Sequence, residues 1–178
     1  VPRLNETLAE AKGQFALECF WALHLSGGFD EEAALAALRH GEPHVRLWAV
    51  RLLGDRKEIS PEVSGGLIKR ASRDTHVEVR SQIACTARRL PAEFGLSIAD
   101  VLLERDEDAS DPHLPLLLWW AIESKCESDP IAVLGSYSRN PFEGVWRTKI
   151  ARQTIGPRLM RRFAATGTRQ DQLYCSSL

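Results

Sequence analysis

The feature that most constrains this chain is an internal repeat. Three segments align when Val45, Val79 and Leu116 are placed at equivalent positions, which gives steps of 34 and 37 residues. A unit of this size cannot bury its own apolar face, so it must stack on its neighbours into a solenoid. The aligned segments are HGEPHVRLWAVRLLGD (40–55), DTHVEVRSQIACTARRLP (74–91) and DPHLPLLLWWAIESKC (111–126), with an earlier relative at 11–28 and a weaker one, NPFEGVWRTKIARQTIG, at 140–156.

Further helical patterns lie between the repeated segments. Asp30 precedes two acidic residues, and Ser60-Pro61 and Asp129-Pro130 place a capping side chain before proline, so all three mark helix starts. No stretch shows the sustained alternation of a strand. We therefore predict an all-α fold, an α-solenoid of four to five helix pairs that forms a single array over residues 1–178. The intervening helices are expected at 30–40, 60–73, 91–105 and 129–139.

The stretch EPHVRLWAVRLLG (42–54) resembles the second helix of a HEAT repeat. In such repeats an aspartate, followed six residues later by an arginine, tends to build a polar ladder between units. Asp74 and Arg80 have this spacing, whereas the first segment has His40 in place of the acid and the third has Leu117 in place of the arginine. The residues that this resemblance assigns to the ladder are Arg46, Asp74, Arg80 and Asp111.

A broader resemblance covers most of the chain. The segments ALECFWALHLSGGFDEEAALAALRHGEPHVRLWAVRLLGD, DPHLPLLLWWAIE and IGPRLMRRFAATGT are similar, in this order, to the HEAT-like region of bacterial multidomain proteins of the membrane-bound-dehydrogenase type. In that family the region follows a β-propeller and precedes a cytochrome c domain. The resemblance implies a fragment of a longer redox protein that is periplasmic or exported. The chain has no Cys-x-x-Cys-His motif, so we expect no haem within it.

The most apolar run, Leu114–Ile122, is too short to cross a membrane. It has nine residues and contains Pro115, whereas a membrane helix needs about 20 apolar residues. A helix that is apolar nearly all round is usually buried on several sides. We therefore expect this helix in the inner layer of a middle repeat.

Trp48 and Trp119 occupy the same repeat position, where the intervening segment has Gln82. Core packing of Trp119 and Trp120 is the first interpretation. However, a position that accepts glutamine favours a partly exposed stripe suited to docking, because tryptophan commonly anchors protein interfaces. The candidate contact residues are Trp48, Trp119 and Trp120, with the exposed member of the adjacent pair left open, and stacking on a small molecule is a third alternative.

No pattern typical of a metal site is present. Structural zinc needs closely spaced ligand pairs, and the chain has no Cys-x-x-Cys pair and no histidine cluster. The run RDEDASD (105–111) resembles the start of a calcium loop, but Asp111 and Leu117 stand where such a loop requires glycine and glutamate. We therefore expect no cofactor here and four free thiols, at Cys19, Cys85, Cys126 and Cys175.

Charge and motifs argue against catalysis and against nucleic acid. The formal net charge is −1, and neither a nucleophile motif beside a base nor a phosphate-binding loop is found. A local basic patch is expected on one helix side, formed by Arg158, Arg161 and Arg162, with Arg169 nearby. We predict a non-catalytic scaffold for protein–protein or inter-domain docking within a larger, haem-containing protein. The alternative is a DNA-binding or base-processing enzyme of the HEAT-like glycosylase type; partner and oligomeric state stay open.

Overall fold

The computed structural model describes residues 2–137, 147–165 and 168–177, and this part of the chain is all-helical with no strand. None of its helices is long and apolar enough to cross a membrane. The first helices are α1 (Pro2–Glu10), α2 (Gly13–Leu25), α3 (Glu31–Leu38), α4 (Pro43–Asp55), α5 (Pro61–Arg73) and α6 (Val77–Arg89). They are followed by α7 (Ala92–Leu103), the 3₁₀ turn η1 (Asp106–Ser110), α8 (Leu114–Cys126), α9 (Pro130–Tyr137), the π-helical turn η3 (Ala151–Ile155), α10 (Gly156–Ala164) and α11 (Arg169–Ser177).

The residues predicted to cap α3 and α5 do so in the structure. Asp30 Oδ1 accepts the Ala33 N–H at 2.9 Å at the start of α3. Ser60 Oγ accepts the Val63 N–H at 3.2 Å, and Pro61 occupies the first turn of α5, where its missing donor costs nothing. The helix expected at 129–139 is α9, and residues 138–139 lie outside the described residues.

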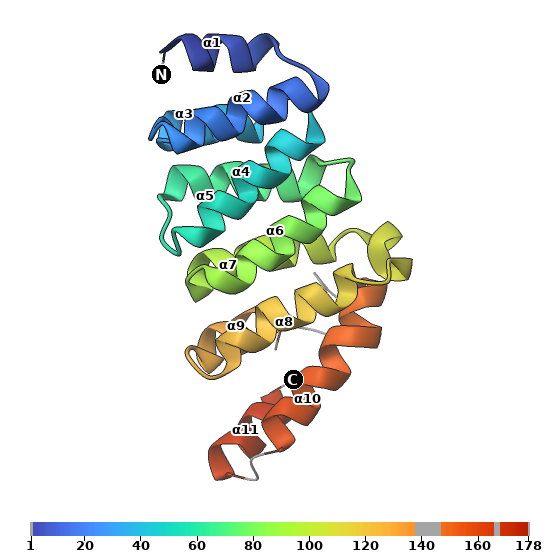
Figure 1. The fold of residues 1–178 in the computed structure, drawn as a ribbon. Coiled ribbons are helices and arrows are strands. Elements are labelled where there is room, and N and C mark those ends of the chain that lie inside the picture. The colour runs from blue at the N-terminus through green and yellow to red at the C-terminus, as the bar shows by residue number, and fades with distance from the viewer. Residues whose placement is uncertain (1, 138–146, 166–167, 178) are drawn as a thin grey trace.

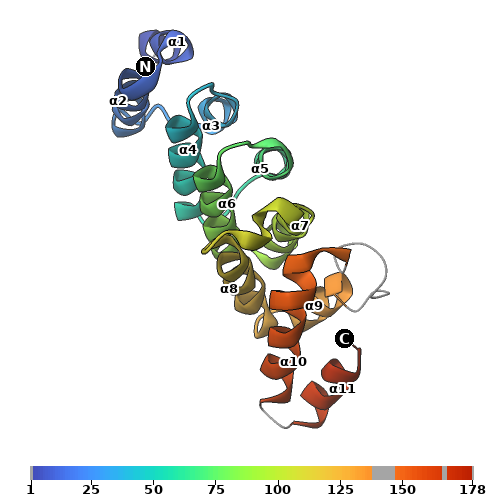
Figure 2. The same ribbon diagram turned by 90° about the vertical axis from the view of Figure 1, so that its right-hand side faces the viewer.

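The helices lie in two rows (Figure 1, Figure 2). Helices α2, α4, α6 and α8 contact one another in sequence and form one row, and α3, α5, α7 and α9 form the other. Helix α10 contacts α8 and η3, and α11 packs on α10. These helix contacts are consistent with a helical repeat.

One buried hydrophobic cluster runs through both rows. Small residues allow close approach where α6 ends against α7: a Cβ built on Gly95 would lie 2.5 Å from the Ala87 carbonyl oxygen. Gly95 is therefore required by packing. Gly65, within α5, has no atom within 4 Å of a built Cβ and is under no such constraint.

Candidate protein-docking face on helices α4, α6 and α8

The two adjacent tryptophans point to opposite environments. Trp119 is buried, at 8% relative exposure, whereas Trp120 is 45% exposed. Core packing, the first interpretation, therefore holds for Trp119 and is wrong for Trp120. The alternative, a partly exposed stripe of Trp48 and Trp119, is wrong for Trp119. Trp48 is partly buried, with its ring centroid 5.4 Å from that of Trp21 in an edge-to-face arrangement.

The reason for the difference is the rotation of α8. Both the Asp-x-His triplet and the helix start recur at a step of 37 from α6 to α8, which is the step that the alignment gave. The buried positions instead recur at a step of 35, so α8 presents a different face than expected. The matching buried pairs are Val79 with Leu114, Ile83 with Leu118, Ala84 with Trp119 and Ala87 with Ile122.

In this corrected register, Arg51 on α4, Cys85 on α6 and Trp120 on α8 occupy equivalent positions of successive repeated segments. They line one surface hollow of about 430 Å³ that runs across all three helices. We call it the α4–α6–α8 hollow. Its lining residues are Arg51, Gln82, Cys85, Arg88, Arg89, Leu117 and Trp120.

The hollow is apolar on its α8 side and basic elsewhere. The guanidinium carbon of Arg51 lies 5.3 Å from the centroid of the Trp48 ring, a cation–π contact that holds its charge beside an aromatic surface. Arg89 pairs with Asp55. Within the described residues, neither Arg51 nor Arg88 makes an ion pair, so both charges are available to a ligand.

Cys85 contributes a neutral group to the hollow. Burial raises the pKa of its thiol, against the opposing effect of Arg89 and Arg88, so it is protonated at neutral pH. All four cysteines are free in the structure, with Cys19 and Cys126 buried and Cys85 and Cys175 partly buried.

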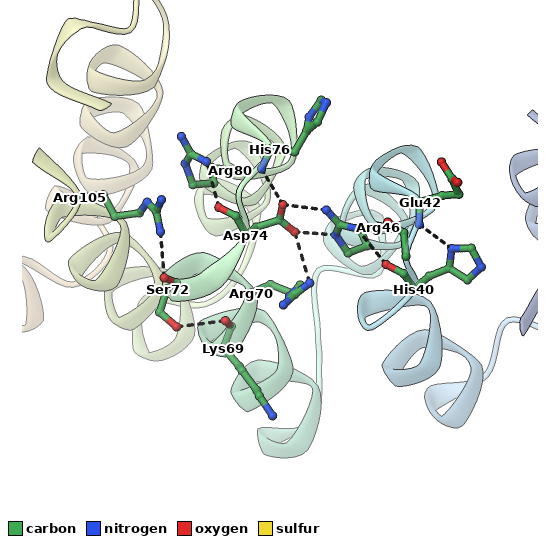
Figure 3. A network of polar contacts seen from close by, with 11 residues as sticks. His40, Glu42, Arg46, Lys69, Arg70, Ser72, Asp74, His76, Arg80 and Arg105 are labelled. Carbon is green, nitrogen blue, oxygen red and sulfur yellow. Dashed lines mark hydrogen bonds and ion pairs between the residues drawn. The ribbon is translucent and has the colours of Figure 1, made fainter. Parts of the chain in front are cut away.

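A buried polar ladder lies where α4 and α6 begin (Figure 3). Arg46 donates from Nε and Nη2 to the two carboxylate oxygens of Asp74, at 2.7 and 2.9 Å. Arg46 Nη1 also donates to the carbonyls of His40 and Gly41. Asp74 Oδ1 additionally accepts the His76 N–H at 3.0 Å.

These contacts determine the charge state of Asp74, which is only 1% exposed. Burial by itself would raise the pKa of its carboxyl group. The hydrogen bonds from Arg46 and the His76 N–H, together with the charges of Arg46 and Arg70, outweigh burial and hold the pKa below its ordinary value. Asp74 is therefore ionised at neutral pH although it is buried.

The second rung repeats the first one 34 residues later. Arg80 donates from Nε to Asp108 Oδ2 at 2.7 Å and from Nη2 to Oδ1. Its Nη1 donates to the carbonyl of Asp74 at 3.0 Å, which links the two rungs. The separation of 34 holds for both the arginines and the acids, 46 to 80 and 74 to 108.

The assignment of Asp111 to this ladder is corrected by the structure. Asp111 Oδ1 accepts the backbone N–H groups of His113 and Leu114, both at 2.8 Å, and so caps the start of α8. The turn η1 adds residues between the ladder acid and the helix, and this brings Asp108 to Arg80 instead. Of the acids in the calcium-loop pattern at 105–111, Asp108 is therefore paired with Arg80 and Asp111 caps α8.

Helix α8 is attached to α6 by a contact that sequence reasoning missed. Lys125, 6% exposed, donates from Nζ to the carbonyls of Arg88 and Leu90 at 2.8 and 2.6 Å. Burial, and secondarily the charge of Arg88, lowers the pKa of Lys125. Arg88 and Leu90 are 37 and 35 residues away from Lys125, so no local sequence pattern indicates the contact.

The basic patch predicted near the C-terminus lies on α10. Arg161 is exposed, while Arg158 and Arg162 are partly buried, and Arg169 begins α11. Arg158 and Arg161 donate to backbone carbonyls of their own helical segment. No group of three or more His, Cys, Asp or Glu side chains arranged to hold a metal ion occurs among the described residues.

Comparison with protein-family models, with curated proteins and with solved structures finds no match for this chain. The function proposed for the chain therefore rests on the geometry of the α4–α6–α8 hollow and of the polar ladder.

Proposed function

We propose that this chain is a HEAT-like α-solenoid that acts as a non-catalytic scaffold for protein–protein or inter-domain docking. The observation that carries the proposal is the α4–α6–α8 hollow, which combines an exposed tryptophan on α8 with two arginines, on α4 and α6, that make no ion pair among the described residues. Tryptophan and arginine are, with tyrosine, the residues enriched among interface hot spots. The ladder supports the proposal because buried, doubly hydrogen-bonded pairs fix the spacing of the helices that carry the hollow.

Site-specific photo-crosslinking in the full-length protein, in its own cells, tests docking at this face. Benzoylphenylalanine in place of Trp120 exchanges one large aromatic side chain for another within the hollow. The matched control is the same residue in place of Ile131, which is 74% exposed on α9 in the other row. We expect a defined cross-link, to another chain or another domain, from position 120 only. Equal products from both positions, or none from position 120, would contradict docking at this face.

The wider setting is also a proposal, and it rests on the family resemblance: a scaffold between a propeller and a cytochrome c domain of an exported redox protein. The measurement is the absorption spectrum of the full-length protein produced with c-type haem maturation. A Soret band is expected. Its absence, with maturation shown to work, would separate this chain from that family.

Nucleic-acid binding remains a second candidate because of one charge feature. Residues 147–169 contain seven Lys or Arg and no Asp or Glu, so the other residues carry the compensating negative charge. Binding to duplex DNA through such a segment would weaken steeply with salt, since it depends on phosphate neutralisation. We expect only weak background binding. Tight, steeply salt-dependent affinity would favour the DNA-binding alternative over docking.

A further inference from the structure

The α4–α6–α8 hollow has a chemical character that specifies its occupant more narrowly than docking in general. Leu117 and Trp120 are three residues apart on α8 and so lie on the same side of that helix. They supply an apolar wall, and Gln82 supplies an amide on α6. A ligand that fills the hollow must therefore bring an apolar side chain.

The charges in the hollow select the sign of the ligand. Arg89 is neutralised by Asp55, but Arg51 and Arg88 have no ion pair within the described residues. A guanidinium presents paired donors that match a carboxylate in a bidentate geometry. Two such groups beside an apolar wall fit carboxylates that flank an aromatic or aliphatic residue.

The surroundings favour a short ligand over a long polyanion. Asp55 ends α4 next to Arg89, and Glu123 follows Trp120 by one helical turn. A phosphate backbone that continued out of the hollow would meet these acids. A short peptide segment places its charge only on Arg51 and Arg88.

The hollow is open because the middle helix, α6, carries a small side chain there. At the position shared by Arg51, Cys85 and Trp120, the two outer helices carry large side chains and α6 carries a small thiol. A larger side chain at position 85 would fill the hollow without changing its charge. This offers a steric variant that is independent of the arginines.

We propose that the α4–α6–α8 hollow binds a short acidic protein segment, with an apolar side chain against Trp120 and Leu117 and carboxylates on Arg51 and Arg88. This inference rests on the docking function proposed above and names the partner class. The occupant is thus a protein segment, and a nucleic acid is an outcome of the test.

Fluorescence anisotropy with defined probes tests the proposal on the purified chain. The probe is a labelled decapeptide in which Asp and Glu flank a central Leu-Phe pair, compared with the same peptide carrying Lys at the acidic positions and with a ten-nucleotide oligothymidylate. We expect the acidic peptide to bind at least about tenfold more tightly than either. Arg88→Ala should weaken it about tenfold, the worth of one charge-assisted hydrogen-bonded contact. Cys85→Leu should abolish binding, and Lys69→Ala, an exposed cation on α5, should change nothing.

A charge-reversal variant distinguishes loss of the binding site from loss of folding, because an unfolded chain would bind neither peptide. Arg88→Glu should lose the acidic peptide and gain affinity for the lysine peptide. Equal binding of both peptides to the unsubstituted chain, or full binding by Arg88→Ala, would overturn the proposal, as would tighter binding of the oligonucleotide. If position 120 cross-links in the full-length protein while the acidic peptide does not bind, docking stands and the acidic partner is refuted. If both fail, both proposals fall.

Discussion

Replacing Asp74 with alanine should remove the buried ion pair that joins Arg46 on α4 to the turn between α5 and α6. The carboxylate accepts two hydrogen bonds from Arg46 and one from the His76 N–H, and both charged side chains are at least 90% buried. Breaking a buried pair by removing one partner costs about 3–5 kcal/mol, because the remaining charge is left uncompensated. Arg46 keeps its bonds to the carbonyls of His40 and Gly41, so we expect the lower end of this range.

Urea unfolding followed by circular dichroism at 222 nm measures the effect. With a denaturant slope of about 2 kcal/mol per molar, a loss of about 3 kcal/mol moves the midpoint by about 1.5 M. The matched control is Asp55→Ala, which breaks a pair with Arg89 whose acid is 52% exposed and should cost less than about 1 kcal/mol. The double variant Arg46→Met, Asp74→Ala should be more stable than Asp74→Ala alone. Equal losses for Asp74→Ala and Asp55→Ala would refute the reasoning.

Further outcomes concern Asp74, Lys125 and two glycines. The pKa of Asp74 is lower in the folded chain than in the unfolded chain, so at pH values between the two the unfolded chain binds more protons. The unfolding free energy, measured by urea unfolding at a series of pH values, should therefore fall as the pH drops from about 4 to the folded-state pKa. Lys125→Met should lower the unfolding free energy by about 1–3 kcal/mol, measured by urea unfolding, since the carbonyls of Arg88 and Leu90 lose their donor. Because folding lowers the pKa of Lys125, the unfolding free energy of the unsubstituted chain should rise with pH from the folded pKa towards 10.5. Gly95→Ala should destabilise, by about 1–3 kcal/mol in thermal or urea unfolding, because its Cβ meets the Ala87 carbonyl, whereas Gly65→Ala should stabilise by about 0.5–1 kcal/mol through helix propensity.

The helices could be predicted from the sequence because the signals that start a helix lie within a few residues of it. Asp30 and Ser60 cap helices within three residues of themselves, and the absence of alternation excluded strands. The arginine of each rung also recurred at a step of 34, which the alignment found directly. The sequence therefore predicts two kinds of feature well: those determined within a single helix, and those that recur at the same position in successive repeated segments.

The third repeated segment could not be placed by the same means. Its helix is apolar on nearly every side, so periodicity does not distinguish the buried Trp119 from the exposed Trp120. The choice of Asp108 over Asp111 depends on which acid lies within reach of Arg80 after η1 has bent the chain. Both errors come from three-dimensional position, which depends on neighbouring units and not on the segment's own pattern.

The hollow takes its geometry from buried polar contacts on the same helices. On α4, Arg46 and Arg51 are five residues apart, and on α6 Arg80 and Cys85 keep this separation, so each ladder arginine lies about 140° around its helix from a residue of the hollow. The ladder thereby ties Arg46 of α4 to the turn before α6, and Arg80 of α6 to that turn and to η1. Helix α8 has Pro115 at the corresponding position, five residues before Trp120, and it is instead held to α6 by Lys125. It follows that Arg51 and Cys85 are positioned by one set of contacts and Trp120 by another, so weakening the Lys125 contact should displace the apolar wall of the hollow while leaving the ladder, and with it the spacing of the two basic helices, in place.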